Sequence, residues 1–158
     1  MDRTERQELI ARYKAGHATL LASLAGIDEA GLDRRPADGG WTPREVVHHT
    51  ADSEMTAAIR LRRLVAEENP VIVGYDGDTF AVRLAYADRP VEPALAAIAA
   101  ARATTVQILD RLTDADWART GTHTEAGAYG VERWLEIYAV HCDEHADQIR
   151  RAREETTG

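Results

Sequence analysis

Apolar residues recur at three- and four-residue spacing in four long segments, which is the pattern of amphipathic helices. The predicted helices cover residues 4–24, 43–68, 92–112 and 131–154. The stripe of the first contains Leu9, Ile10, Tyr13, His17, Leu20, Leu21 and Leu24. That of the third contains Leu95, Ile98, Ala99, Arg102, Val106 and Leu109. Four such helices predict an all-α four-helix bundle, in one domain of residues 1–158.

Local residues mark both ends of the second predicted helix. Thr42 is a favourable N-cap, Pro43 suits the first helical position, and Glu45 completes a capping box with Thr42. Pro70 cannot continue the helix because it lacks a backbone N–H. These signals set the first and last turns of the helix, which its apolar pattern alone does not define.

The connections between the predicted helices differ in length. Residues 69–90 carry weak helical signals around a glycine-containing turn, so we expect a long, partly helical connection. Its 22 residues can extend to roughly 70 Å, whereas the second helix is about 39 Å long. The second and third helices can therefore run parallel. We further expect a capped turn at 113–117 and a glycine-containing loop at 119–130.

Composition and charge narrow the possible partners. The chain has 44% apolar and 29% charged residues, which is typical of a globular protein. Its net charge of -8 disfavours nucleic acid, because an acidic surface repels phosphates. The best candidate for a basic patch is Arg60, Arg62 and Arg63, but acidic neighbours indicate a solvated helix face. We expect no nucleic-acid partner.

Other sequence features indicate the compartment. No apolar run is long enough to span a bilayer, and the charged N-terminal segment lacks the apolar centre of a signal peptide. The single cysteine, Cys142, can form no intrachain disulfide, which fits a reducing compartment. We therefore expect a cytoplasmic protein with no membrane partner.

Candidate chemistry concentrates in the six histidines. His141 and His145 are four residues apart in the last predicted helix, so they share one face and can chelate a divalent ion. A hydrogen-bonded histidine pair in the core explains the same spacing equally well. The motif is not HExxH, because Glu144 directly precedes His145, so the usual base of a zinc peptidase is missing.

The second predicted helix offers a third histidine, either His48 or His49. The two side chains point about 100° apart, so only one is expected to face the same centre. His49 shares a semi-polar stripe with Val46, Ser53 and Thr56, and His48 a more apolar one with Val47, Ala51, Met55 and Ala58. Periodicity alone does not choose between them.

Polar residues near these histidines are candidates for catalysis or for orienting a ligand. Asp52 and Glu54 follow His49 closely, and each either orients a ligand imidazole or faces solvent. Tyr138 lies one turn before His141 and is a candidate proton donor or a packing residue. Gln148, one turn after His145, has the same two interpretations.

Five further residues are interpreted as structural. His17 is expected in the core and His123 on the surface of a loop. Cys142 is expected to pack as a small apolar group. Trp41 and Trp117 are interpreted as core anchors.

Several stretches resemble the DinB/YfiT-like family. WTPREVVHHTADSE, residues 41–54, is similar to the family pattern W-S-x-x-E-x-x-x-H-x-x-D/S-E. EIYAVHCDEHADQIRR, residues 136–151, looks like the family's closing helix with its H-x-x-x-H motif. The stretches at 69–81 and 121–141 also resemble it, and the similarity extends over residues 12–153.

The resemblance implies a fold and a metal site. The fold is a bundle in up-down-down-up order with a long second connection. The family's ligand follows its tryptophan by eight residues, so Trp41 points to His49 rather than His48. The implied site is nickel or zinc on His49, His141 and His145, with water in the remaining positions. A homodimer is compatible with the family.

The resemblance also implies a class of reaction. Family members are hydrolases or transferases of low-molecular-weight thiols such as bacillithiol or mycothiol. Three histidines leave a coordination position open, as catalytic metal sites do. We expect a metal-dependent enzyme with a small-molecule substrate. The alternatives are a non-catalytic metal- or ligand-binding module, for example a stress-related one, and a metal-free helical interaction protein.

Overall fold

A computed structural model describes residues 1–154, so the last four residues of the predicted domain, 155–158, lie outside the described residues. Its four long helices are α1 (Arg3–Ser23), α3 (Pro43–Ala66), α5 (Val91–Leu109) and α7 (Val131–Glu154). The predicted ends differ from the observed ones by three residues or fewer. The four-helix prediction is confirmed.

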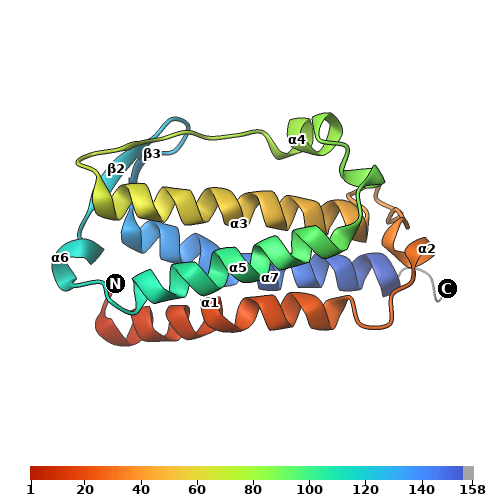
Figure 1. Cartoon of the computed structure of the whole chain (residues 1–158), viewed down its shortest axis with the longest axis horizontal. Coiled ribbons are helices and arrows are strands. Elements are labelled where there is room, and N and C mark those ends of the chain that lie inside the picture. The colour runs from red at the N-terminus through yellow and green to blue at the C-terminus, as the bar shows by residue number, and fades with distance from the viewer. Residues whose placement is uncertain (155–158) are drawn as a thin grey trace.

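The four long helices follow an up-down-down-up order (Figure 1). α1 and α7 run in one direction, and α3 and α5 run in the other. α1 packs along α7, whereas α3 packs on both α5 and α7. The chain between α3 and α5 returns along the length of the bundle, which allows these two neighbours to be parallel. The predicted topology is therefore confirmed.

The start of α3 shows why the sequence predicted it well. The Thr42 hydroxyl accepts a 3.2 Å hydrogen bond from the Glu45 backbone N–H. The Glu45 carboxylate accepts one of 2.8 Å from the Thr42 backbone N–H. Two otherwise unpaired donors are satisfied, and Pro43 occupies the first turn, where it breaks no helical hydrogen bond.

Short helices fill the connections. α2 (Glu29–Leu32) and α6 (Asp114–Trp117) lie between long helices, and α6 begins with the predicted Thr113 cap. The second connection contains α4 (Gly77–Arg83) and the 3-10 helix η1 (Tyr86–Asp88), both packed on α3. The partly helical connection is thus confirmed.

A small sheet was not predicted. β1 (Val71–Ile72) pairs in parallel with β2 (Thr120–His123), which pairs in antiparallel fashion with β3 (Gly127–Gly130). The expected loop at 119–130 is therefore a β-hairpin. The residues of the hairpin show no clear alternation of apolar and polar positions. Pairing of β2 with β1 and β3 stabilises these strands instead, and a local pattern does not reveal that pairing. At Gly121 an added Cβ would collide with the Pro70 carbonyl oxygen, so glycine permits this close approach.

Two apolar clusters form the core of the bundle. One gathers around Tyr13, Leu61 and Trp134 near the sheet, and the other around Leu20, Val46 and Ile98 near the opposite end. Trp117 belongs to the first, as expected of a core anchor. Within the described residues, no helix combines the length and apolar character needed to cross a membrane.

Candidate metal centre

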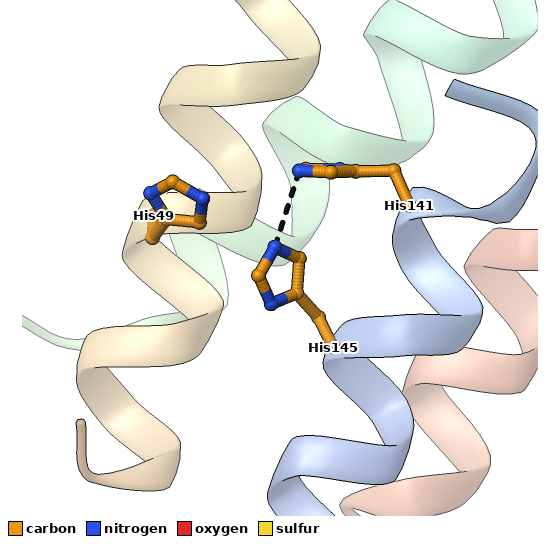
Figure 2. Close-up of side chains that lie close together, drawn as sticks. All are labelled: His49, His141 and His145. Atoms are coloured by element: carbon orange, nitrogen blue, oxygen red, sulfur yellow. Dashed lines mark hydrogen bonds between the residues drawn. The ribbon is translucent and has the colours of Figure 1, made fainter. Parts of the chain in front are cut away.

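Three of the predicted histidines meet between α3 and α7. His49 comes from α3, and His141 and His145 come from α7; one ring nitrogen of each lies within 4.8 Å of the others. The Nε2 atoms of His141 and His145 are 3.1 Å apart. Figure 2 shows the three rings converging on the space between the two helices. The structure thus brings the whole predicted ligand set together.

His48 points elsewhere. Its ring is buried and stacks on Tyr86, with centroids 5.6 Å apart. Its Nε2 lies 3.1 Å from the Arg89 carbonyl oxygen, to which it donates. His48 therefore ties the second connection to α3, and the side chain that faces α7 is that of His49.

The environment keeps two of the site imidazoles neutral. Burial, followed by the proximity of His145 and His141, lowers the pKa of His49 to about 3. Burial and the nearby His141 lower the pKa of His145 to about 4. Both rings are therefore unprotonated at neutral pH. Their nitrogen lone pairs are available to a metal ion.

Polar side chains lie behind both α7 histidines. His145 Nδ1 lies 2.9 Å from the side-chain oxygen of Gln148, which is an acceptor, so Nδ1 donates and Nε2 carries the lone pair. His141 Nδ1 lies 3.4 Å from Glu54 Oε1 but forms no hydrogen bond within the described residues, and its Nε2 faces His145 and the Ser53 hydroxyl at 3.3 Å. Carboxylate or amide partners behind metal-binding histidines commonly set this orientation.

Glu54 is completely buried, so its solvent-facing interpretation was wrong. Its Oε1 lies 2.5 Å from Arg102 Nη1, and the Arg102 guanidinium stacks over the Tyr13 ring at 3.8 Å. A buried carboxylate needs a cation or strong donors, and Arg102 supplies both. Glu54 therefore links α3 to α5 and α1 and places its charge behind His141.

Cys142 lies against this charged pair. It packs in the second apolar cluster, as expected, and its Sγ also lies 3.1 Å from Arg102 Nη1 and 3.6 Å from Glu54 Oε1. Burial and the Glu54 charge raise the pKa of the Cys142 thiol, which stays protonated. It is not part of the histidine cluster.

The two candidate catalytic residues differ in position. Asp52 accepts a 2.5 Å hydrogen bond from the Tyr86 hydroxyl, so its carboxylate holds η1 on α3. Tyr138 lies beside the centre, with its ring 5.6 Å from that of His141. The Tyr138 hydroxyl accepts a 3.1 Å hydrogen bond from Arg60. Of the two candidate carboxylates, Glu54 rather than Asp52 lies behind a site imidazole.

Three other predicted positions are resolved by their contacts. His123 is buried in β2, where Nδ1 accepts from the backbone N–H groups of residues 125 and 126, so its placement on the surface was wrong. His17 is half-buried on α1. Trp41 is half-buried rather than a core anchor, and its ring covers His49 at 4.5 Å. Gly77 lies against both rings, since an added Cβ would be 3.3 Å from Trp41 and 3.4 Å from His49.

The donor set fits a transition-metal ion. Two imidazole nitrogens bound at about 2.0–2.1 Å to one ion are expected about 2.9–3.4 Å apart at angles near 90–110°. The separation of 3.1 Å between the two Nε2 atoms lies in that range. Neutral imidazoles suit zinc, nickel, copper and iron, and an all-nitrogen set does not suit magnesium or calcium.

Comparison of the sequence with known proteins identifies the family. The family model of the DinB superfamily matches residues 12–149. The chain belongs to the DinB superfamily. Relatives in the superfamily include a protein of Oceanobacillus iheyensis, 40% identical over 118 residues, which are 75% of this chain and 68% of the relative. Another, from Bacillus mycoides, is 33% identical over 135 residues, or 85% and 78% of the two chains. Both carry the provisional name of metal-dependent hydrolase.

Two solved structures share this four-helix bundle fold. YfiT from Bacillus subtilis matches with a TM-score of 0.91 and 26% identity, over 98% of this chain and 89% of its own. It is described provisionally as a metal-dependent hydrolase with an unusual four-helix bundle topology. A second four-helix bundle protein, TT2238, matches with a TM-score of 0.65 and 28% identity, over 92% and 98% of the two chains.

Proposed function

We propose that this DinB-superfamily protein is a metal-dependent hydrolase in which His49, His141 and His145 bind one divalent ion, nickel or zinc. The convergence of three imidazoles, with Nε2 atoms of two of them 3.1 Å apart, carries this proposal. The provisional names of the relatives and of YfiT support it.

The ion supplies the chemistry and the chain supplies its position. A divalent ion held by the three imidazoles would make a bound water a nucleophile at neutral pH. Gln148 holds the His145 imidazole from behind by a hydrogen bond, and the Glu54 carboxylate places a negative charge 3.4 Å behind His141 Nδ1. Trp41 and Gly77 pack against the third and shield it from bulk water.

Tyr138 is the proton donor of the proposed reaction. Its hydroxyl oxygen accepts from Arg60, which leaves the phenolic proton free to be donated to a substrate oxygen. Burial raises the pKa of Tyr138, so the phenol is protonated at neutral pH. Its ring lies 5.6 Å from His141, next to the space that a substrate on the metal would occupy.

Transfer of a low-molecular-weight thiol is the second candidate, and one observation favours it. Hydrolysis usually uses a carboxylate base, but the nearby carboxylates are engaged: Glu54 with Arg102 and Asp52 with Tyr86. A thiol bound to a divalent ion is already a thiolate and needs no such base.

Activity assays distinguish the two reactions. Metal-loaded protein is supplied with simple esters and amides, or with a thiol and an electrophile, and compared with His145→Ala. We expect turnover of one class, lost by about 100-fold or more in His145→Ala and retained in His17→Ala, which alters a histidine of α1. Absence of both reactions in fully loaded protein would contradict an enzyme and leave a metal-binding module.

A further inference from the structure

Arg60 lies next to Tyr138, beside the proposed metal centre, and has no counter-ion within the part of the chain that the structure describes. The sequence suggested a solvated arginine on α3, but its side chain turns to Tyr138, to which Nη1 donates at 3.1 Å. Nη2 donates to the Val73 carbonyl oxygen at 2.7 Å. The ion pairs found within residues 1–154 give Arg44 two carboxylates and Arg102 one, and give Arg60 none.

Among residues 1–154, two buried polar atoms at this place have no hydrogen-bond partner. They are Nε of Arg60 and the hydroxyl of Tyr129. Tyr129 is only 4% exposed, and burial raises the pKa of its phenol, while the charge and the nearby N–H groups of Arg60 partly offset this rise. Unpaired buried donors are costly, at about 1–3 kcal/mol each, and call for a partner that the protein itself does not supply.

The aromatic surroundings give this place a defined shape. The Arg60 guanidinium lies 5.8 Å from the centroid of the Tyr75 ring, while Tyr138 and Tyr129 approach it with their hydroxyl ends. A planar cation with free N–H groups, flanked by phenol donors, is suited to a carboxylate. One positive charge matches one carboxylate better than a doubly charged phosphate.

The cluster connects to both the metal centre and the surface. Ser53 lies 3.3 Å from His141, and its hydroxyl is close enough to Tyr138 and Tyr75 to act on both phenols. On its other side Arg60 lines a groove of about 360 Å³ with Met55, Ile59 and Val73. A ligand can therefore reach the guanidinium from solvent.

We propose that Arg60, with the hydroxyl of Tyr129, binds a carboxylate of the small-molecule substrate while the reacting end lies between Tyr138 and the three-histidine centre. The substrate class is thus an acid whose carboxylate stands several bonds from the reacting group. The proposal rests on the proposed metal site for the position of that reacting end.

The test uses nickel-loaded protein and two kinds of thiol. The probes are ω-mercaptocarboxylates with two to five methylene groups and the neutral 2-mercaptoethanol. Their Kd values are measured from the thiolate-to-nickel absorption band. We expect one chain length to bind at least about tenfold more tightly than the neutral thiol. Arg60→Gln should remove this preference and leave the Kd of 2-mercaptoethanol unchanged.

Arg63→Gln is the matched control, because it removes the same charge one turn along α3 from an arginine paired with Glu67. It should retain the preference. If Arg60→Gln lowers the melting temperature, Arg60→Lys serves in its place, since it keeps the charge without the planar donors and should reduce the preference. Equal affinity for charged and neutral thiols at every length, or equal losses in Arg60→Gln and Arg63→Gln, would overturn the proposal.

Failure of the metal site gives a different result. If the protein takes up no nickel, the proposed function fails, and butyrate is titrated into the metal-free protein by calorimetry. Butyrate binding that Arg60→Gln abolishes and Arg63→Gln preserves would still support the carboxylate site. No butyrate binding to the metal-free protein would reject it independently of the metal.

Discussion

At the scale of single residues, the site depends on a buried charge pair that local patterns concealed. Periodicity placed Arg102 on the inner face of its helix, and a buried guanidinium requires a carboxylate partner. That partner is Glu54, 48 residues earlier in the chain. The sequence left Glu54 between two interpretations because the pairing depends on how α3 and α5 are packed.

Replacing Glu54 should affect both metal affinity and stability. Glu54→Gln removes the charge behind His141 and should weaken metal binding by about 10- to 100-fold. It also leaves Arg102 buried without a counter-ion, which should cost about 3–5 kcal/mol of unfolding free energy. Metal titration and urea denaturation measure the two effects, with Glu67→Gln as the exposed control.

A double variant distinguishes the effect of Glu54 on the metal-binding His141 from its effect on the stability of the fold. Glu54→Gln with Arg102→Met removes both buried charges, so much of the stability should return while metal affinity stays low. Recovery of full affinity together with stability would mean that Glu54 acts on the fold alone.

The histidine pKa values predict a pH dependence of the metal-free protein. His49 and His145 have pKa values of about 3 and 4 when folded, against 6.5 as the ordinary value. The unfolded chain therefore binds more protons below pH 6.5, and the unfolding free energy should fall as the pH drops from 6.5 towards 4. Urea denaturation with chelator at pH 7.5, 6.5 and 5.5 measures this fall.

The double variant His49→Gln, His145→Gln provides the comparison. Both groups lose their titration, so the dependence between pH 7.5 and 5.5 should be visibly flatter. His48 and His17, whose pKa values are also lowered by burial, remain in the variant and account for the residual slope. An unchanged slope would show that the two site histidines are not buried as neutral groups.

At the scale of elements, the helices were predictable and the sheet was not. Thr42, Pro43 and Pro70 mark α3 through interactions within a few residues. The register of β1 with β2 pairs Ile72 with His123, 51 positions apart, so no local window contains it. The same distant pairing buries His123, which a local interpretation placed on the surface.

Gly16 tests how closely the long helices approach. A Cβ added there would lie 2.7 Å from Arg102 Nη2 and 2.9 Å from Cys142 Cβ, so Gly16→Ala should destabilise the protein by about 1–3 kcal/mol. In an exposed helix interior the same change would stabilise by about 1 kcal/mol. Chemical denaturation decides the sign, and a stabilised variant would contradict the close packing of α1 on α5 and α7.

At the scale of the whole molecule, the topology was predicted from the length of the second connection and from the resemblance to the DinB/YfiT-like family. The long second connection permitted parallel α3 and α5 without requiring them. The family similarity supplied the order, and the observed bundle and its match to YfiT confirm it. The spacing of residues alone did not show whether His48 or His49 is the metal ligand. The family pattern pointed to His49, and in the structure His48 is instead stacked on Tyr86.

The central claim is that His49, His141 and His145 together hold one divalent metal ion, and metal content tests it most directly. Protein purified without chelator or nickel resin is analysed for metals beside the triple variant His49→Ala, His141→Ala, His145→Ala. We predict about one nickel or zinc ion per wild-type chain and none in a folded triple variant. A metal-free wild type that also takes up no added nickel or zinc would contradict the account.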